Sequence, residues 1–496
     1  MKTAAIAFSL SAATSAWLTP VVGAAAHRYG FLDHALSSRK IHGRPIPRLG
    51  GIAIVVAFYA PLLALLLVHG SGVGARFWGD LPHALGLFLG GAVIAALGVY
   101  DDLFGAGARL KFAVQFGVAA LMYAFGFRID AIAVPLLHTV SVGWLGLPLT
   151  MLWIAGVINA LNLIDGLDGL AGGTALIAVV ATFVEATSRG NALMMLFMGA
   201  LGGAILGFLR YNLNPARIFM GDTGSMFLGF VLAVSSIQTA HKSSAAVALA
   251  IPVVALGLPI ADTLLAMARR AVRGVPLFAA DRDHIHHRLL ERGLTQKQAV
   301  RALWAASALL GCSAVALTRL SGVAAAAFLV GVAATFVLGL RRLGYLRMSC
   351  PRDLLERRRR NVMTLQAIRE VGERLARADR GEDVWVAVCA AAPVLGVSCV
   401  ALRRGGPAGA NQPIVSDGFQ EAGPAPFVAR FSLRPERPGG DELELGWRDG
   451  RRKLSRDTEI AVELLCGYLH DALDRFDPDV PLAPARHEPG RSRLAS

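Results

Sequence analysis

Charged residues are scarce in this chain, and their scarcity excludes an ordinary soluble protein. Only 17% of the 496 residues are charged and 54% are hydrophobic, whereas a soluble domain carries about one quarter charged residues. Acidic residues are the scarcer kind, since 35 Asp and Glu face 49 Lys and Arg, which gives a formal net charge of +14. The composition predicts a polytopic helical membrane protein, and its 54 glycines suit close helix packing in a bilayer.

Cysteine is scarce as well, and the chain has no internal repeat. The five cysteines form no CxxC pair, which argues against a disulfide framework and against a zinc site. The lack of a repeat argues against a transporter, because transporters are often built from inverted repeats. A basic chain can bind nucleic acid, but here the basic residues lie in short loops between apolar runs. Membrane topology therefore explains them better, and we expect no nucleic-acid partner.

Eleven apolar runs are long enough to cross a bilayer, which takes about 20 helical residues. They lie near 3–25, 51–69, 82–100, 111–127, 147–163, 169–187, 191–209, 225–240, 246–268, 298–317 and 321–340. The first run is followed by three alanines and so resembles a cleaved secretory signal. However, the next loop carries five basic residues between Arg28 and Arg48, a strong positive-inside signal, so we interpret the run as a retained span.

Basic residues favour one set of alternating loops. Four of the five loops that follow the first, third, fifth, seventh and ninth runs are basic, whereas the opposite loops are nearly free of basic residues. The positive-inside rule places the basic set in the cytoplasm. The N-terminus is then outside, and residues 341–496 are inside.

The unusual polar clusters fall in these same five loops, although random placement would scatter them over both faces. They are the first loop, 39–51, with Lys40 and Arg48; Asp101 and Asp102, followed by Lys111; the stretch 159–169, with Asn159, Asn162, Asp165 and Asp168; the loop 219–225, with Asp222; and the loop 281–288, with His284, His286 and His287. The coincidence predicts one active site, assembled at the cytoplasmic face.

Carboxylates and amides at the ends of the spans point to a divalent cation. Adjacent carboxylates such as Asp101 and Asp102 are costly at a membrane edge unless they bind a cation or handle a proton, and a helix cap would need only one of them. Asn159, Asn162 and Asp165 recur every three residues and so share a helix face. Hard oxygen ligands suit Mg²⁺ and its phosphate partners, and a polar seam between helices is the alternative.

Three further clusters allow more than one interpretation. Asp222 lies between glycines that permit close backbone approach, so it suits a metal ligand, with capping of the following helix as the alternative. The clustered histidines would suit a transition metal, but no zinc pattern accompanies them, so we prefer contacts with phosphate. The first loop, stiffened by Pro and Gly, suits phosphate binding or a positive-inside anchor. Asp262, inside the ninth run, is expected to pair with a cation of a loop.

The composition changes after Leu340. Residues 341–378 form a basic and amphipathic helical linker, in which Val362, Leu365, Ile368 and Val371 recur at helical spacing. Residues 379–476 are expected to form a soluble α+β domain, and residues 477–496 a disordered tail. The predicted fold class is therefore an all-α polytopic membrane protein of about eleven transmembrane helices, followed by a small cytoplasmic α+β domain.

Taken together, the five loops resemble those of the polyprenyl-phosphate N-acetylhexosamine-1-phosphate transferases, glycosyltransferase family 4. The matching stretches are RKIHGRPIPRLGG at 39–51, DD at 101–102, NALNLIDGLDGLAGG at 159–173, FMGDTGS at 219–225 and DRDHIHHRLL at 281–290. The resemblance spans roughly residues 25–340, and it is closest to undecaprenyl-phosphate N-acetylglucosamine-1-phosphate transferases. The H-x-H-H form and the RKIH loop look unlike the phospho-N-acetylmuramoyl-pentapeptide branch. Residues 379–476 resemble a GAF-type sensory domain.

The resemblance implies a role for the charged, amide and histidine residues of these motifs. Asp222, with Asp165, is the expected magnesium ligand, and Mn²⁺ is an alternative cation. The expected catalytic residues are Asp101, Asp102, Asp165 and Asp168. The expected substrate contacts are Lys40, Arg48, Lys111, Asn159, Asn162, His284, His286 and His287.

The resemblance also implies an activity and its partners. We expect a phosphotransferase that moves a sugar-1-phosphate, by default N-acetylglucosamine-1-phosphate, from a UDP-sugar to undecaprenyl phosphate and releases UMP. It would sit in the bacterial inner membrane, with the active site and the C-terminal domain in the cytoplasm, and initiate a cell-envelope polysaccharide such as lipopolysaccharide. Transfer of the muramoyl-pentapeptide phosphate, a membrane transporter and a sensory or assembly protein with an inactive core are the alternatives, and a homodimer is left open.

Overall fold

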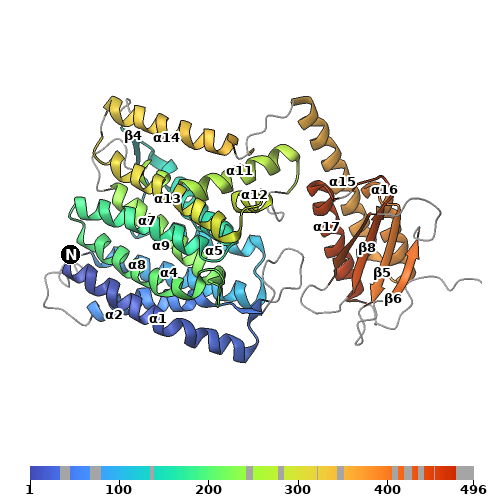
Figure 1. The fold of residues 1–496 in the computed structure, drawn as a ribbon, viewed down its shortest axis with the longest axis horizontal. Coiled ribbons are helices and arrows are strands. Elements are labelled where there is room, and N and C mark those ends of the chain that lie inside the picture. The colour runs from blue at the N-terminus through green and yellow to red at the C-terminus, as the bar shows by residue number, and fades with distance from the viewer. Residues whose placement is uncertain are drawn as a thin grey trace, which may run out of the picture. The chain divides into compact units, whose positions relative to one another are not determined.

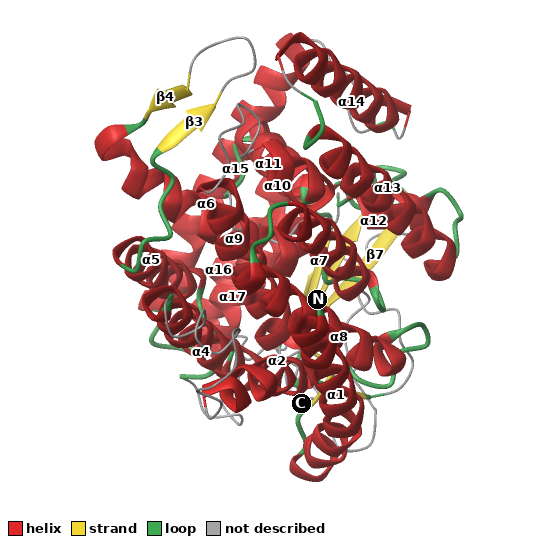
Figure 2. Cartoon of the chain, turned by 90° about the vertical axis from the view of Figure 1, so that its left-hand side faces the viewer, coloured by secondary structure: helices red, strands yellow, loops and turns green. Residues whose placement is uncertain are grey.

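The structure is a computed structural model of the chain, and it is mostly helical (Figure 2). It describes residues 1–33, 45–66, 80–133, 139–241, 250–276, 284–320, 322–342, 344, 351–404, 412–417, 427–433, 441–451 and 453–475. The chain divides into two compact units. The first holds the helices up to Met267 and the helices from α12 to α14, and the second holds the last turns of α11 from Ala268 and the chain from α15 onward.

The first unit is a bundle of helices (Figure 1). Its elements are α1 (Lys2–Tyr29), α2 (Gly50–Leu66), α4 (Leu81–Phe104), α5 (Ala108–Ala124), the 3-10 helix η1 (Gly143–Leu145), α6 (Gly146–Ile164), α7 (Leu170–Ser188), α8 (Ala192–Asn212), α9 (Gly221–His241), α10 (Ala250–Ala255), α11 (Gly257–Arg273), α12 (Ile285–Glu291), α13 (Gln296–Leu317) and α14 (Gly322–Arg342). Two short antiparallel hairpins join them, β1 (Leu32–Asp33) with β2 (Ile46–Pro47) and β3 (Ala131–Ala133) with β4 (Thr139–Ser141).

The described chain has seven helices long and apolar enough to cross a membrane, which makes this a multi-pass membrane protein. They are α1, α4, α6 with η1, α7, α8, α13 and α14. The count of about eleven spans expected from the sequence is not confirmed. One expected span, 246–268, is divided between α10 and α11. The ring of Pro259 excludes a helical carbonyl four residues earlier, at Ala255, and this ends α10 where it does.

Helix α1 packs along α8 through glycines that recur every fourth residue. A Cβ atom on Gly199, Gly203 or Gly207 of α8 would overlap the backbone of α1, at the carbonyl oxygens of residues such as Ala4 and Phe8. Small residues at this spacing allow two helix backbones to approach closely in a bilayer. Helix α1 therefore packs closely against the bundle, and its retention in the membrane stays a prediction.

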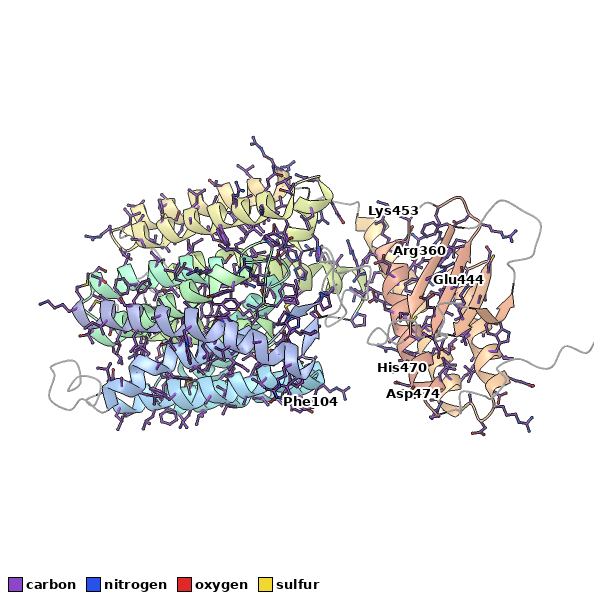
Figure 3. The ribbon with its side chains drawn as sticks, turned by 60° about the horizontal axis from the view of Figure 1, so that its bottom comes forward. Phe104, Arg360, Glu444, Lys453, His470 and Asp474 are labelled. Atoms are coloured by element: carbon purple, nitrogen blue, oxygen red, sulfur yellow. The ribbon has the colours of Figure 1, made fainter. Side chains whose placement is uncertain are left out.

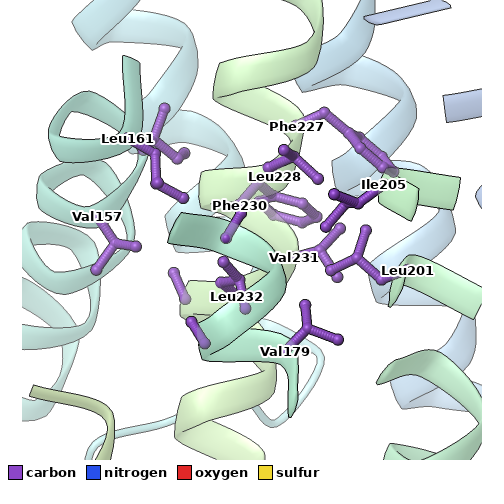
Figure 4. Close-up of a cluster of buried hydrophobic side chains, with 14 of the residues drawn as sticks. Val157, Leu161, Val179, Leu201, Ile205, Phe227, Leu228, Phe230, Val231 and Leu232 are labelled. Atoms are coloured by element: carbon purple, nitrogen blue, oxygen red, sulfur yellow. The ribbon is translucent and has the colours of Figure 1, made fainter. Parts of the chain in front are cut away.

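Helix α9 is enclosed by its neighbours and forms the centre of the first unit. Phe227 and Phe230 are fully buried, and Figure 4 shows them near Leu161 of α6, Val179 of α7 and Leu201 of α8. A helix that is apolar on all sides is buried on all sides. The loop at the start of α9 is therefore attached to the most enclosed helix of the bundle.

The second unit is a small α+β domain. It contains α15 (Pro351–Arg377), α16 (Gly381–Leu395), the strands β5 (Cys399–Arg404), β6 (Gln412–Asp417), β7 (Phe427–Ser432) and β8 (Glu442–Trp447), and α17 (Arg456–Leu473). The strands form one antiparallel sheet in the order β6-β5-β8-β7. On β8, which carries Glu444 (labelled in Figure 3), that carboxylate is buried and bonded to Arg403 and Arg430 of the neighbouring strands.

The amphipathic helix expected within 341–378 corresponds to α15, and its apolar residues belong to the core of this domain. Leu365, Ile368, Val371 and Leu375 are buried together with Trp447. Their spacing of three and four residues places them on one face of the helix. The expected tail, 477–496, lies outside the described residues.

Candidate active site

The first polar loop and the loop before α9 are held together by their backbones. The Gly50 and Gly51 amides donate to the carbonyl oxygens of Phe219 and Met220 over 3.0 and 2.8 Å, and a Cβ on Gly51 would overlap the backbone of Gly224. Glycine is needed where two backbones approach this closely. The PRLGG and FMGDTGS stretches, far apart in the sequence, therefore form one structural unit.

Asp102, at the end of α4, caps the start of α9. Its carboxylate accepts hydrogen bonds from the Asp222 amide (2.8 Å), the Thr223 amide (3.0 Å) and the Thr223 hydroxyl (2.6 Å). The first amides of a helix lack partners within the helix, and a carboxylate there also interacts favourably with the helix dipole. Both oxygens of Asp102 are therefore engaged in positioning α9, and its catalytic role stays a prediction.

Lys111, at the start of α5, joins Asp101 of α4 to Asp222 of α9. Its ammonium group lies 2.7 Å from Asp222 Oδ2 and makes an ion pair with Asp101 Oδ2. Asp101 also accepts a hydrogen bond from the Ala106 amide over 2.5 Å. The three expected residues thus converge, and a single cationic side chain lies between two carboxylates.

The amides of α6 differ in their surroundings. Asn162 donates to Ser225 Oγ over 3.0 Å, and its side chain is also within hydrogen-bonding reach of Asp222. Asn159 lies one turn further into the bundle, where it donates to Gln115 Oε1 over 2.6 Å and to the Ala155 carbonyl over 2.7 Å. Asn162 therefore belongs to the carboxylate cluster, whereas the Asn159 amide bonds to groups of the helix bundle, and its expected contact with substrate stays a prediction.

Asp165 follows the last residue of α6 and is surrounded by negative charge. Within the described chain its carboxylate has no hydrogen bond or ion pair, unlike Asp101 and Asp102. Burial, and then the carboxylates of Asp222, Asp102 and Asp168, raise the pKa of Asp165 to about 8. A bound cation would relieve this repulsion, which makes Asp165 suited to a metal ligand.

Asp168 holds the loop between α8 and α9. Its Oδ2 accepts hydrogen bonds from Asn214 Nδ2 over 2.8 Å and from the Ala216 amide over 3.0 Å. Asn212 of α8 supports the same region, because its side chain accepts from the Gly169 amide and donates to the Ile218 carbonyl. These bonds tie the turn after α6 to the loop that leads into Asp222.

The histidine segment lies against the turn after α6. A Cβ on Gly166 would meet His286 Nε2 at 2.6 Å. Burial and the neighbouring His287 and His284 lower the pKa of His286 to about 3, so its imidazole is neutral. The His284 Nδ1 atom lies 2.9 Å from Asp262 Oδ2, so Asp262 pairs with an imidazole of the histidine segment.

The first loop contains two of the expected substrate contacts, Lys40 and Arg48. Arg48 makes an ion pair with Asp33 of β1 through one guanidinium nitrogen, which anchors the loop, and its expected contact with substrate stays a prediction. Lys40 lies outside the described residues.

The donor atoms fit a magnesium ion that arrives with phosphate. No group of three or more His, Cys, Asp or Glu is arranged as a complete metal cage within the described ranges. Mg²⁺ does not require such a cage, because it is usually held by one or two carboxylates together with substrate phosphates and water. Asp222 and the unbonded Asp165 supply two carboxylates of this kind.

Sequence reasoning missed residues whose partners lie far along the chain. Gln115, Thr223 and Asn212 bond to Asn159, Asp102 and Gly169 across separations of more than forty residues. Gln115 is a polar residue inside an apolar run, and this signal could have identified it.

Several known proteins are similar in sequence to this chain. The profile of Glycosyl transferase family 4 matches residues 84–240. A Bacillus subtilis protein named "Probable undecaprenyl-phosphate N-acetylglucosaminyl 1-phosphate transferase" is 36% identical over 313 residues, which are 63% of this chain and 84% of that protein. A Mycolicibacterium smegmatis decaprenyl-phosphate N-acetylglucosaminephosphotransferase is 32% identical over 292 residues, 54% of this chain and 70% of that protein.

A phospho-N-acetylmuramoyl-pentapeptide-transferase of Shouchella clausii is also similar, but over less of the chain. It is 35% identical over 206 residues, which are 39% of this chain and 61% of that protein. The profile match includes Asp101, Asp165 and Asp222, and the histidine segment lies beyond it.

Proposed function

This chain belongs to Glycosyl transferase family 4, a family of sugar-phosphate transferases, and we propose that it transfers N-acetylglucosamine-1-phosphate from UDP-N-acetylglucosamine to undecaprenyl phosphate. The observation that carries the proposal is the convergence of Asp101, Lys111 and Asp222, from three helices, at one end of a membrane bundle. The chain covers 84% of the Bacillus subtilis relative, whose name contains undecaprenyl phosphate and N-acetylglucosaminyl 1-phosphate, and this supports the proposed acceptor and transferred group.

The proposed reaction exchanges one phosphate bond for another. An oxygen of the lipid phosphate attacks the β-phosphorus of the UDP-sugar, the bond from the β-phosphorus to the bridging oxygen breaks, and UMP leaves with that oxygen. The second pKa of a phosphate monoester is near 6, so the acceptor is largely a dianion at neutral pH. A general base is therefore less important than position and charge.

The described side chains account for position and charge. Asp222 and Asp165 would hold Mg²⁺, which neutralises the diphosphate when it is bound. The Lys111 ammonium lies beside Asp222, where it can stabilise the negative charge that moves to the leaving UMP. Asp102 fixes the start of α9, so that Asp222 does not have to be ordered when the substrate binds.

We propose that the site faces the cytoplasm of a bacterium across its inner membrane, because the loops at this end of the bundle carry the basic residues. UDP-sugars and the C-terminal domain would then share that compartment. A homodimer stays a prediction, which the sedimentation of the purified protein in detergent would test.

The direct test supplies purified enzyme with undecaprenyl phosphate and separate UDP-sugars, and identifies the lipid product by mass. We expect an undecaprenyl diphosphate that carries N-acetylglucosamine, with one UMP released per product. UDP-N-acetylmuramoyl-pentapeptide is included because of the shorter match to its transferase. A product from that nucleotide alone would favour the alternative activity, and no product from any nucleotide would contradict the proposal.

The metal assignment has a separate test. Asp222→Ala is expected to abolish transfer, and EDTA is expected to abolish transfer by the unchanged protein, with recovery on addition of Mg²⁺ or Mn²⁺. Thermal unfolding in detergent checks that the variant is folded. Normal turnover by folded Asp222→Ala, or full activity in EDTA, would contradict the assignment.

A further inference from the structure

Asp262 is a buried carboxylate of α11 that the proposed reaction does not use. Its residue is 3% exposed, and an unpaired carboxylate at such a depth would be costly. One oxygen, Oδ2, lies 2.9 Å from His284 Nδ1, and the other, Oδ1, accepts the Ile285 amide over 3.0 Å. A single side chain of a bundle helix therefore binds both the ring and the backbone at the start of the histidine segment.

These two bonds restrict the histidine segment in two ways. The bond to the Ile285 amide satisfies an amide at the start of α12 and holds that helix against α11. The bond to Nδ1 favours the tautomer with its proton on Nδ1 and fixes the plane of the His284 ring. A carboxylate that orients an imidazole in this way acts through the imidazole, without touching the reacting atoms.

The histidine segment connects His284 to the turn that carries Asp165. The His284 and His286 rings are parallel, with an interplanar angle of 2° and 5.8 Å between centroids. His286 in turn contacts Gly166, the residue after Asp165. A shift of α12 would therefore change the contact between His286 and the turn after α6.

We propose that Asp262 is a positioning residue of the transferase, which orients His284 and α12 so that the histidine segment meets the Asp165 turn and the UDP-sugar. This inference rests on the proposed function. It separates Asp262 from Asp165 and Asp222, which are assigned to the cation, and likens it to Asp102, which also uses both oxygens to hold the start of a helix.

Asp262→Asn tests the role of the carboxylate with little change in volume. The amide oxygen can still accept from Ile285, but the amide nitrogen places a donor against His284 Nδ1, which favours the other tautomer. We expect the KM for the UDP-sugar to rise about tenfold or more, in line with other residues that orient a functional histidine. The KM for undecaprenyl phosphate should be unchanged. A smaller folded fraction would instead lower kcat and leave both KM values unaltered.

Glu185→Gln is the matched control. Glu185 is also a buried carboxylate of a bundle helix, 3% exposed and paired with Arg189 over 3.1 Å. It lies fifteen residues beyond the start of α7, about 22 Å along the helix axis at 1.5 Å per residue. We expect normal KM values for this variant, so that an effect of Asp262→Asn is not attributed to the loss of any buried carboxylate.

A double-mutant cycle tests whether Asp262 acts through His284. If it does, His284→Ala should impair the enzyme, and Asp262→Asn should add little further loss in the His284→Ala background, because coupled residues are not additive. Losses that multiply independently would overturn the inference, as would normal UDP-sugar kinetics for folded Asp262→Asn.

Hydrogen exchange supplies a measurement that does not depend on activity. Asp262→Ala removes the acceptor of the Ile285 amide, so exchange over 284–291 should become faster than in the unchanged protein and in Glu185→Gln. Unchanged exchange would overturn the positioning role. If the wild-type protein is inactive but exchange is faster in Asp262→Ala, the proposed function is contradicted. The structural role of Asp262 in holding the start of α12 would still be supported.

Discussion

At the scale of single residues, Lys111 separates two carboxylates that would otherwise repel each other. Asp101 and Asp222 come from different helices, and the Lys111 ammonium makes an ion pair with each. Removing one partner of a partly buried ionic cluster leaves uncompensated charge. Lys111 thus has two roles. It neutralises the two neighbouring carboxylates, and in the proposed reaction it stabilises the charge on the leaving UMP.

Lys111→Gln is expected to lower the rate of transfer by about 100-fold, the usual effect of losing one charge-stabilising donor in an active site. Arg109→Gln is the matched control, because Arg109 is an exposed basic residue two positions away at the start of the same helix. Initial rates of UMP release measure both variants. Equal rates for the two would show that the effect is one of surface charge alone.

The raised pKa of Asp165 predicts a pH dependence of metal binding. A cation binds the ionised carboxylate, so below the pKa of about 8 a proton must first be displaced. The Mg²⁺ concentration that gives half-maximal activity should therefore fall as the pH rises toward 8, by up to about tenfold per unit, and then level off. Asp165→Asn should remove this dependence. A half-maximal concentration that does not change with pH in the unchanged protein would contradict the assignment.

At the scale of helices, the close approach of α1 and α8 depends on glycine. The side chain of Gly203→Leu would overlap the Phe8 carbonyl, so the helices would have to separate. We expect a loss of about 1–3 kcal/mol in stability, as for other overpacked cores, measured by thermal unfolding in detergent. Gly331→Leu in α14 is the control, because no atom lies within 4 Å of a Cβ there. A similar melting temperature for both variants would contradict this packing argument.

Helix ends account for much of the site. Asp102 caps α9 from the end of α4, and Asp262 binds the start of α12 from within α11. In each case the capping side chain comes from another helix, so the cap also fixes the relation between two helices. The sequence shows which residues are able to cap but not which helix they cap, since such partners are remote along the chain.

At the scale of the whole molecule, the two units have separate hydrophobic cores. The core of the second unit contains residues of α15, α16, α17 and the sheet, together with Val275 after α11. The carboxylate cluster and the histidine segment are both in the first unit. The proposed chemistry therefore does not require a residue of the second unit from α15 onward.

Truncation after residue 350 tests this division. We expect the truncated protein to insert in membranes and to retain transfer activity, because the match to Glycosyl transferase family 4 ends at residue 240 and the site residues precede α15. Activity and the unfolding temperature should be compared with those of the full chain at equal amounts of folded protein. A folded truncated protein without activity would show that the C-terminal domain takes part in the reaction.

Much of the fold could be predicted from the sequence, because a bilayer imposes simple rules. Apolar runs of sufficient length must be helical, since a span has no water to satisfy its backbone, and each of the eleven predicted runs overlaps a helix of the described residues. The number of spans could not be predicted as well. The division of 246–268 at Pro259 lies within a run that reads as one apolar span in the sequence.

The site could be predicted as a set of residues but not as a set of roles. Asp101, Lys111, Asn162, Asp165 and Asp222 do converge, as alternate loops of a helical bundle should.

The contacts that each of these residues makes could not be predicted from the chain. Asp102, Asp168 and Asn159 each bond to other protein groups, and their roles in catalysis or substrate binding stay predictions. The sequence alone does not distinguish an aspartate that caps a helix from one that binds a cation.

The sequence by itself determined that this protein is a bundle of membrane helices with the acidic residues of its candidate site in loops that share one end, because hydropathy and charge are local properties of the chain. Only the tertiary structure decided which carboxylates have partners and which are left available. That distinction depends on donors such as the Asp222 amide and the Lys111 ammonium, which reach Asp102 and Asp101 only after distant helices have packed.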